Sequence, residues 1–435
     1  MALGGGVFVA QNKKLPGAYI NFISAAKANA TLSDRGIVAL PMALNWGTEG
    51  EVIELTSESF IYNSRKILGY EYSDPALIGL REVFKNAQKV FVYRLGTGGV
   101  KASNTFCEAK YSGTRGNDLK TVVTANVDEP EKFDVKTLLG TTVVDVQTGV
   151  KNTDELTDND FVTWKNSVEV SLTANTPLTS GTTGSVTTSD WQKALEALEA
   201  YSFNTLGVVS NDNAIKDLAI AYTKRLRDEV GVKFQTVVFN KAANDKAIIN
   251  VVSTPVGETD SADVVYWVTG AQAGCAVNAS CTNKMYDGEL SVDVKRTQAQ
   301  LSECIDGGQF VLHKVGDEVR VLVDINSKVD TSVEEGEDFK SNQTVRVIDQ
   351  IGNDIAVLFN TYYLGKIPND DGGRISLWND IVKHHQDLQN IRAIEDFKPE
   401  DVTVSRGDNK KSVVVSDYVT PVNAMEQLYM TCVIS

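Results

Sequence analysis

The chain has 435 residues, 42% of them hydrophobic, which suits two or more folded domains and excludes a disordered polypeptide. Acidic residues outnumber basic ones by 57 to 42, and the net charge of −15 argues against nonspecific binding to DNA, RNA or anionic lipid. The longest apolar runs have about six residues, far short of the ~20 that a membrane-spanning helix needs. No basic stretch opens the N-terminus, so we expect no secretory signal.

The N-terminal part predicts an extended segment followed by a small α/β unit. Residues 16–24 alternate polar and apolar side chains after a glycine-rich lead, which predicts a strand too short to form a sheet without a partner. Residues 36–41 and 90–94 predict two buried strands, and residues 75–88 place apolar side chains at helical spacing. We therefore expect a strand–helix–strand unit behind a separate N-terminal strand.

The composition changes at Gly96. Residues 96–188 are rich in Thr, Val, Gly, Asn and Asp, with short alternating runs, and they close with a linker-like stretch at 176–185. This composition predicts a compact all-β insertion. Leu95-Gly-Thr-Gly-Gly99 follows a strand, but it lacks the G-x-G-x-x-G spacing and no helix pattern follows it. A junction between domains explains this sequence better than a nucleotide site does.

Helices and strands alternate from Ser189 to about residue 324. Ser189 and Asp190 can cap a first helix, residues 211–213 can cap a second, and Gly231 can end it. The predicted strands are residues 205–209, 234–239, 247–252 and 319–324. This rhythm predicts a largely parallel sheet covered by helices.

Two long helices are predicted after an acidic connector at residues 330–338, which we expect to be solvated. The apolar positions of the first run from Val345 to Tyr362, and the second helix covers about residues 375–391. His384 and His385 are adjacent on the second helix and point about 100° apart, so they cannot bind one metal as an i, i+4 pair could. We expect one of them to face the core and the other to face solvent.

A hairpin and a final extended run end the chain. Residues 402–406 and 412–416 predict the hairpin, whose turn contains an Arg406-Gly-Asp408 tripeptide that a turn requires anyway. Residues 425–434 alternate their side chains between two faces. The last four residues, Cys432-Val-Ile-Ser435, match a C-a-a-X lipidation box, but no basic residue precedes them, so we interpret them as the end of a strand.

Residues suited to catalysis are scarce. Five cysteines at irregular spacings argue against a disulfide framework, and Cys275, Cys281 and Cys304 lack zinc-type pairing, so we expect small core cysteines and no metal or cofactor. His313 is the only histidine near the β–α–β region, and no G-x-S-x-G motif accompanies it. These counts favour assembly or binding over chemistry.

Both ends of the chain are strand-like, and turn-rich or flexible lead-ins tether them. Soluble monomers usually suppress isolated edge strands, so two of them suggest strand addition to neighbouring subunits. The alternative is that both strands join the chain's own sheet. The residues that we expect to exchange are Tyr19, Ile20, Asn21, Phe22, Leu428, Tyr429, Met430, Thr431, Cys432 and Val433.

Several segments, taken together and in order, carry a resemblance to a known family. They are Leu15-Pro-Gly-Ala-Tyr-Ile-Asn-Phe22, Arg35-Gly-Ile-Val-Ala-Leu-Pro41 with Trp46-Gly47, Arg346-Val-Ile-Asp-Gln-Ile-Gly-Asn-Asp-Ile355, Gly373-Arg-Ile-Ser-Leu-Trp378, and the run from Val414 to Met430. The chain resembles the tail-sheath proteins of contractile phage tails and of phage-tail-like bacteriocins, especially those of Gram-positive bacteria. The resemblance covers essentially the full length and is weakest in the β insertion.

The resemblance implies a structural subunit that forms stacked rings of six around an inner tube. Contraction of this polymer would drive the tube through a target cell envelope, while N- and C-terminal arms exchange strands between neighbours. The implied partners are copies of the chain, the tube protein, and baseplate and tail-terminator proteins, with no direct nucleic-acid binding and no membrane insertion by this chain. The implied location is a virion tail or tail-like particle assembled in the bacterial cytoplasm.

The expected fold class is multidomain α/β and α+β, with a subtilisin-like, non-catalytic core. The expected parts are exchange arms at 1–28 and 418–435, a small α/β part of the core at 29–95, a β-rich insertion at 96–188, a subtilisin-like domain at 189–330, and a tube-facing domain at 331–417. Tube-facing charges are expected at Arg374, Lys383 and Arg392, with ordinary solvated helix charge as the alternative.

Two other functions stay open from the residues alone. An α/β hydrolase with β accessory domains would need a nucleophile and a base near His313. A surface or adhesion module would need the Arg406-Gly-Asp408 turn to be presented to a receptor.

Overall fold

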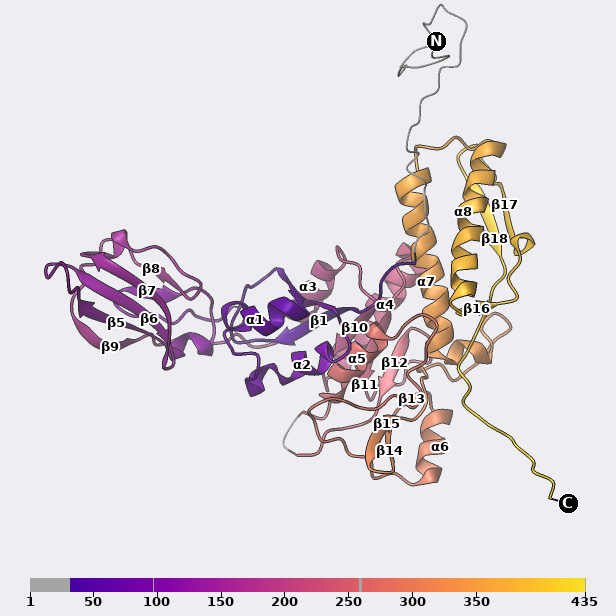
Figure 1. The fold of residues 1–435 in the computed structure, drawn as a ribbon, viewed down its shortest axis with the longest axis horizontal. Coiled ribbons are helices and arrows are strands. Elements are labelled where there is room, and N and C mark those ends of the chain that lie inside the picture. The colour runs from indigo at the N-terminus through magenta and orange to yellow at the C-terminus, as the bar shows by residue number, and fades with distance from the viewer. Residues whose placement is uncertain (1–31, 97, 258–259, 435) are drawn as a thin grey trace, which may run out of the picture.

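The computed structural model describes residues 32–96, 98–257 and 260–434, so the predicted N-terminal strand with Tyr19, Ile20, Asn21 and Phe22 lies outside the described residues. A seven-stranded sheet in the order β13-β12-β11-β10-β1-β3-β2 forms the centre of the molecule (Figure 1). Its strands are β1 (Ile37–Ala43), β2 (Val52–Thr56), β3 (Lys89–Leu95), β10 (Thr205–Val208), β11 (Gln235–Phe239), β12 (Ile248–Val251) and β13 (Gln309–Phe310).

All neighbouring strands of this sheet run parallel, except that β2 is antiparallel to β3. Parallel sheets are covered on both faces, so their strands consist of nearly continuous apolar residues. Every residue of β10, β11 and β12 is buried, in agreement with that rule. The predicted strands 36–41, 90–94, 205–209, 234–239 and 247–252 are thus confirmed.

Helices cover both faces of the sheet. On one face, α3 (Thr188–Leu198) and α4 (Asn213–Arg225) pack against Phe91 and Leu206. On the other face lie α1 (Ser57–Leu68), α2 (Ile78–Phe84) and α5 (Val264–Gly274), which bury Leu40 and Val237. The helix predicted over 75–88 is shorter than expected, a 3₁₀ turn at Pro75–Leu77 followed by α2. The N-cap of α3 is Thr187, whose hydroxyl accepts from the Asp190 amide, so the predicted caps Ser189 and Asp190 lie within the first turn of the helix.

The insertion predicted over 96–188 is β-structured, as the composition indicated. Four strands, in the order β7-β6-β5-β9, form its main sheet, and two short strands pair beside it. These are β4 (Cys107–Ala109), β5 (Leu119–Ala125), β6 (Phe133–Leu139), β7 (Thr142–Val150), β8 (Val162–Trp164) and β9 (Thr173–Pro177). Figure 1 shows this part at one end of the molecule. In chain order it follows β3 and precedes α3.

Glycines allow the two chain segments that enter and leave the insertion to lie side by side. Val100 and Thr182 exchange backbone hydrogen bonds of 3.0 Å in both directions. A Cβ on Gly99 would lie 2.1 Å from the Thr182 carbonyl oxygen, and one on Gly96 would lie 2.8 Å from that of Gly184. Gly96 and Gly99 therefore lie at a junction between domains, as predicted, and close approach of a second backbone requires both glycines.

The C-terminal part is built on two long helices. α7 (Asn342–Leu358) continues as a wider turn over Phe359–Tyr363, and α8 (Asp371–Asn390) runs beside it (Figure 1). The predicted hairpin is confirmed as β17 (Val402–Arg406) and β18 (Val413–Asp417), with β17 against α8. The remaining elements are α6 (Gln298–Asp306), β14 (Leu312–Val315), β15 (Glu318–Val321), β16 (Ile394–Glu395) and β19 (Thr420–Pro421). No helix among the described residues is long and apolar enough to cross a membrane.

We expect Gly99→Ala to weaken the junction, because the added methyl group overlaps a backbone carbonyl that cannot move freely. The expected loss is about 1–3 kcal/mol in the free energy of unfolding of the insertion, measured by thermal or denaturant unfolding. Gly336→Ala is the matched control, because nothing lies within 4 Å of its Cβ position and its φ is −76°. Equal stability of the two variants would contradict the close contact.

Candidate assembly site

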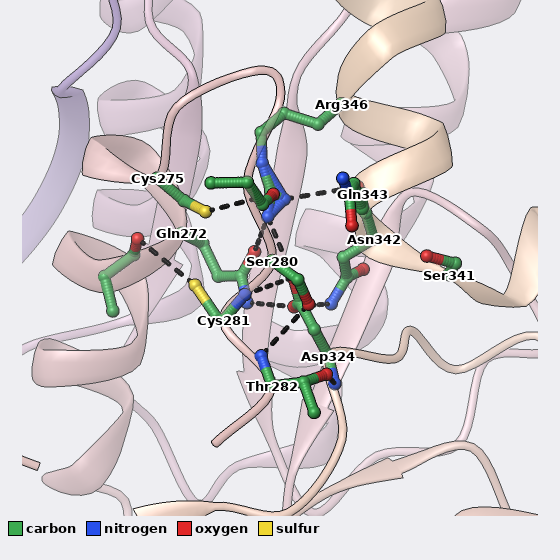
Figure 2. Close-up of polar contacts among 12 residues, drawn as sticks. Gln272, Cys275, Ser280, Cys281, Thr282, Asp324, Ser341, Asn342, Gln343 and Arg346 are labelled. Carbon is green, nitrogen blue, oxygen red and sulfur yellow. Dashed lines mark hydrogen bonds and ion pairs between the residues drawn. The ribbon is translucent and has the colours of Figure 1, made fainter. Parts of the chain in front are cut away.

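A buried polar cluster joins α7 to the sheet domain (Figure 2). The Arg346 guanidinium, fully buried, donates from Nη2 to Asp324 Oδ2 over 2.9 Å. Three further donors reach the Asp324 carboxylate: Gln272 Nε2 at 2.6 Å, Asn342 Nδ2 at 2.9 Å and the Cys281 amide at 2.9 Å. Four donors satisfy this buried charge, so the first turns of α7 are tied to the end of α5 and to the segment after β15.

Two cysteines lie against this cluster. Cys281 is fully buried and Cys304 is buried elsewhere, as predicted for core cysteines, whereas Cys275 is only partly buried. A hydrogen bond shared with Cys281 and the nearby Arg346 charge together lower the pKa of the Cys275 thiol to about 7, against the opposite effect of burial. The same hydrogen bond, together with burial, raises the pKa of Cys281.

A second buried ion pair fixes the middle of α7. Arg227, from the turn after α4, donates from Nη1 and Nη2 to the two carboxylate oxygens of Asp349 over 2.6 and 2.7 Å. Its Nη1 also donates to the Phe234 carbonyl over 2.6 Å. This bidentate geometry sets the rotation of α7 relative to α4 and β11.

A chain of polar groups continues from α7 through α8 to β18, with Asp354, His384 and His385 buried and Asp417 exposed at its end. Asp354 accepts from Ser33 Oγ over 2.7 Å and faces His384 Nε2 at 3.0 Å, while His385 Nε2 lies 2.8 Å from Asp417 Oδ2. Burial alone would raise the pKa of the Asp354 carboxyl, but hydrogen bonds from His384, Ser33 and Gln350 outweigh it and hold that pKa below its ordinary value.

The sequence prediction that one of the two adjacent histidines faces solvent is wrong. Both His384 and His385 are 0% exposed. The reason is that α8 is covered on two sides: Asp354 of α7 meets one ring, and Asp417 of β18 and the Phe397 ring meet the other. A helix face that looks toward solvent by periodicity is thus closed by the hairpin, which comes later in the chain.

The C-terminal segment is anchored briefly and then leaves the molecule. β19 pairs with β16, and Gln343 of α7 binds both the Val422 carbonyl and the Ala424 amide. Beyond these contacts residues 425–434 are extended, in no described strand, and run away from the body (Figure 1). Their large apolar side chains are at least 73% exposed: Met425, Leu428, Tyr429, Met430, Val433 and Ile434.

The β17–β18 ribbon offers an outer edge. It has two strands among the described residues, and the Gly407 amide donates to the Ser412 carbonyl. Because successive residues of an antiparallel pair alternate their amides between the partner and the outside, the N–H groups of Val413 and Val415 point away from β17. Val414 and Val415 are 49% and 39% exposed, so this edge combines unpaired amides with apolar side chains.

The three predicted tube-facing charges do not form one patch. Arg374 is mostly buried at the start of α8, where its guanidinium contacts Asp371 and donates to the Asn369 carbonyl over 3.0 Å. Lys383 is exposed nine residues later, which places it about 180° around the helix from Arg374. Arg392 follows the helix at φ 62° and lines an open groove of about 510 Å³ with Phe397 and Lys398.

Among the described residues, the His313 side chain has no hydrogen-bond or ion-pair partner that could form a nucleophile–base pair with it. This side chain lies half-buried on β14 opposite Arg320, and burial lowers its pKa. Within the described ranges, no group of three or more His, Cys, Asp or Glu side chains could hold a metal ion.

Four family descriptions match successive parts of the chain. They are the Gp18 domain III N-terminal region of tail sheath proteins (residues 35–95), the phage tail sheath beta-sandwich domain (97–184), the phage tail sheath central domain (184–327) and the phage tail sheath C-terminal domain (334–435). Together they span nearly everything from residue 35 to the end.

Individual relatives agree over the full length. The XkdK protein of the phage-like element PBSX of Bacillus subtilis is 33% identical over 98% of this chain and 99% of its own. The sheath tail protein of Desulfitobacterium hafniense has a TM-score of 0.85 at 33% identity, over 95% of this chain and 99% of its own. The helical sheath of the anti-feeding prophage in its contracted state shares the fold at 12% identity, with a TM-score of 0.58 over 97% and 99%.

Replacing Arg346 with Met should destabilise the full chain by about 3–5 kcal/mol, because it leaves the buried Asp324 carboxylate without its charge partner. Arg320→Met is the matched control, since the ion pair of Arg320 with Glu318 is exposed. Its loss should lower the free energy of unfolding by less than about 1 kcal/mol. Urea unfolding at neutral pH measures both. Similar losses in the two variants would mean that the cluster does not hold α7.

Proposed function

The chain belongs to the phage tail sheath family, and from this premise we propose that it polymerises as stacked hexameric rings around an inner tube. Contraction of the polymer drives the tube through a target cell envelope. The observation that carries the proposal is that one subunit has both an exposed apolar C-terminal segment and an open edge on the β17–β18 ribbon. An exposed apolar segment and an unpaired strand edge each favour aggregation when left uncovered. When the segment of one copy pairs with the edge of another, both are covered.

Strand exchange is the proposed means of linkage. Residues 428–433 of one copy add to a sheet edge of a neighbour, and β18 supplies the edge through the outward amides of Val413 and Val415. Tyr19, Ile20, Asn21 and Phe22 make the corresponding N-terminal strand. Each backbone hydrogen bond contributes about 0.5–1.5 kcal/mol net, so a short ladder with buried apolar side chains holds two subunits while other contacts change.

Such a linkage suits a polymer that must shorten without coming apart. The extended sheath is proposed to be metastable, and contraction releases free energy as subunit surfaces reach more favourable contacts. Hydrogen bonds hold Asn423 and Ala424 to α7. The residues between Ala424 and the exchanged strand act as a tether, with one hydrogen bond to the body, from Thr282 to Glu426, among the described residues. The subunit body can therefore rotate while the ladder stays paired.

The C-terminal domain, residues 331–417, is proposed to face the tube and the insertion to face outward. The two lie at opposite ends of the long axis in Figure 1, which suits a subunit spanning the sheath wall. Of the three charges considered, Lys383 and Arg392 are exposed and Arg374 is mostly buried, so we propose the two exposed side chains for tube contact. Baseplate and terminator proteins are the proposed partners at the two ends of the polymer.

The chain is a structural sheath protein of a phage tail or contractile injection system and not an enzyme. This removes the hydrolase alternative, and His313 needs no catalytic role. We propose that the protein resides in a virion tail or a headless tail-like particle after assembly in the bacterial cytoplasm.

Deleting residues 425–435 should abolish polymerisation while the body stays folded, because the strand donor is lost but no described core residue is removed. Negative-stain electron microscopy and sedimentation measure this, with the full chain forming striated sleeves. The assembled fraction should fall below about a tenth of that of the full chain. Deleting residues 1–22 tests the other arm in the same way. Normal sleeves from both truncated chains would contradict strand exchange.

Val415→Pro tests the acceptor edge, because proline removes an outward N–H and leaves the bonds between β17 and β18 in place. We expect a folded subunit that fails to assemble. Val333→Pro, in the fully exposed acidic connector, is the matched control and should assemble normally. Assembly of the Val415 variant, together with failure of the C-terminal deletion, would place the acceptor on another edge.

A further inference from the structure

Two buried histidines have no part in the proposed strand exchange. His384 and His385 are neighbours on α8, both 0% exposed, and their Nδ1 atoms lie 3.2 Å apart. Burying an ionisable group costs free energy unless each of its polar atoms has a hydrogen-bond partner. Each of these four ring nitrogens therefore needs a donor or an acceptor that matches its own protonation.

The outer nitrogen of each ring faces a carboxylate. His384 Nε2 lies 3.0 Å from Asp354 Oδ2, and His385 Nε2 lies 2.8 Å from Asp417 Oδ2. An ionised carboxylate only accepts hydrogen bonds, so each Nε2 carries a proton. A neutral imidazole has a single N–H, so two neutral rings would turn two bare Nδ1 lone pairs toward each other across 3.2 Å. Two imidazolium rings would instead oppose two N–H groups.

We infer that the pair His384–His385 is a proton-binding site that holds one proton between its two Nδ1 atoms. With three protons on four ring nitrogens, one Nδ1 donates to the other at an ordinary hydrogen-bond distance, and both Nε2 atoms donate outward. The pair then carries one positive charge between two negative ones. This is the arrangement in which every polar atom of the rings has a partner of the right kind.

The surroundings favour this single charge. The titratable groups that contact the rings within the described residues are Asp354 from α7 and Asp417 from β18, both acidic. Ser33 and Gln350 donate to Asp354, so that carboxylate is also satisfied on its far side. The apolar ring of Phe397 also packs near the pair, with its centroid 5.1 Å from that of the His385 ring. A buried cation flanked by two hydrogen-bonded carboxylates has its desolvation cost offset from both sides.

The shared proton closes one continuous chain of hydrogen bonds across three elements. It runs from Ser33 through Asp354 and the two rings to Asp417. Asp417 is the last residue of β18, and the C-terminal segment begins after it. Gain or loss of one proton replaces the central attraction with repulsion and loosens the hold of α8 on β18. This inference concerns the isolated subunit and holds whether or not strands are exchanged.

Nitrogen-15 spectra of the full chain labelled only in histidine test the proton count directly. The chain has three histidines, so His313 serves as an internal reference. At neutral pH we expect both Nε2 atoms of the buried pair to be protonated and their two Nδ1 atoms to share one proton, with N–N coupling across the bond. Two bare Nδ1 atoms, or two protonated ones, would overturn the inference.

Asp417→Asn separates this charge effect from simple loss of packing, because the amide oxygen still accepts from His385 while one flanking charge is removed. At neutral pH the histidine spectra of this variant should show less of the proton shared between the two Nδ1 atoms than those of the natural chain, because one flanking negative charge is gone. Asp408→Asn, on the exposed hairpin tip, is the matched control and should leave the spectra unchanged. Unchanged spectra in the Asp417 variant would mean that the pair holds no extra charge.

Discussion

Charges buried along α7 have to find partners on other elements, and this requirement positions the C-terminal half of the subunit. Arg346, Asp349 and Asp354 follow one another at spacings of three and five residues, and each meets a different element. Asp324 lies beyond β15, Arg227 lies after α4, and His384 lies on α8. A buried ion pair adds little net stability over a well-packed apolar contact, but breaking one is costly, so these pairs mainly select one arrangement of the elements. The register of α7 follows from them.

The sequence predicted most of the regular structure because hydrophobic periodicity decides it. The strands of the central sheet, the apolar faces of α3 and α4, the β character of the insertion and the C-terminal hairpin all follow from local spacing. The antiparallel strand β2 and the helix α1 were not predicted, although α1 buries Phe60, Ser64 and Leu68 at spacings of four residues. Their burial depends on contacts with β3 and α2, which are distant in sequence.

The polar interior could not be found in the same way. Arg346, Asp349 and Asp354 fall between the apolar positions of α7, where periodicity assigns residues to solvent. Nothing local distinguishes a solvated aspartate from one that meets a buried arginine 122 residues away. The prediction that one of the two adjacent histidines faces solvent was wrong for the same reason, since the hairpin that covers them comes later in the chain. What the residues did indicate was the shortage of catalytic groups, while the exchange of strands by the C-terminal end stays a prediction.

The junction at Gly96 and Gly99 has a consequence for how this architecture can vary. The segments that enter and leave the β domain are hydrogen-bonded to each other at Val100 and Thr182, so they diverge from a single point on the subunit. Whatever lies between them can be exchanged, enlarged or trimmed without changing the strand order of the central sheet. The same point is a natural place to graft a foreign domain onto the subunit.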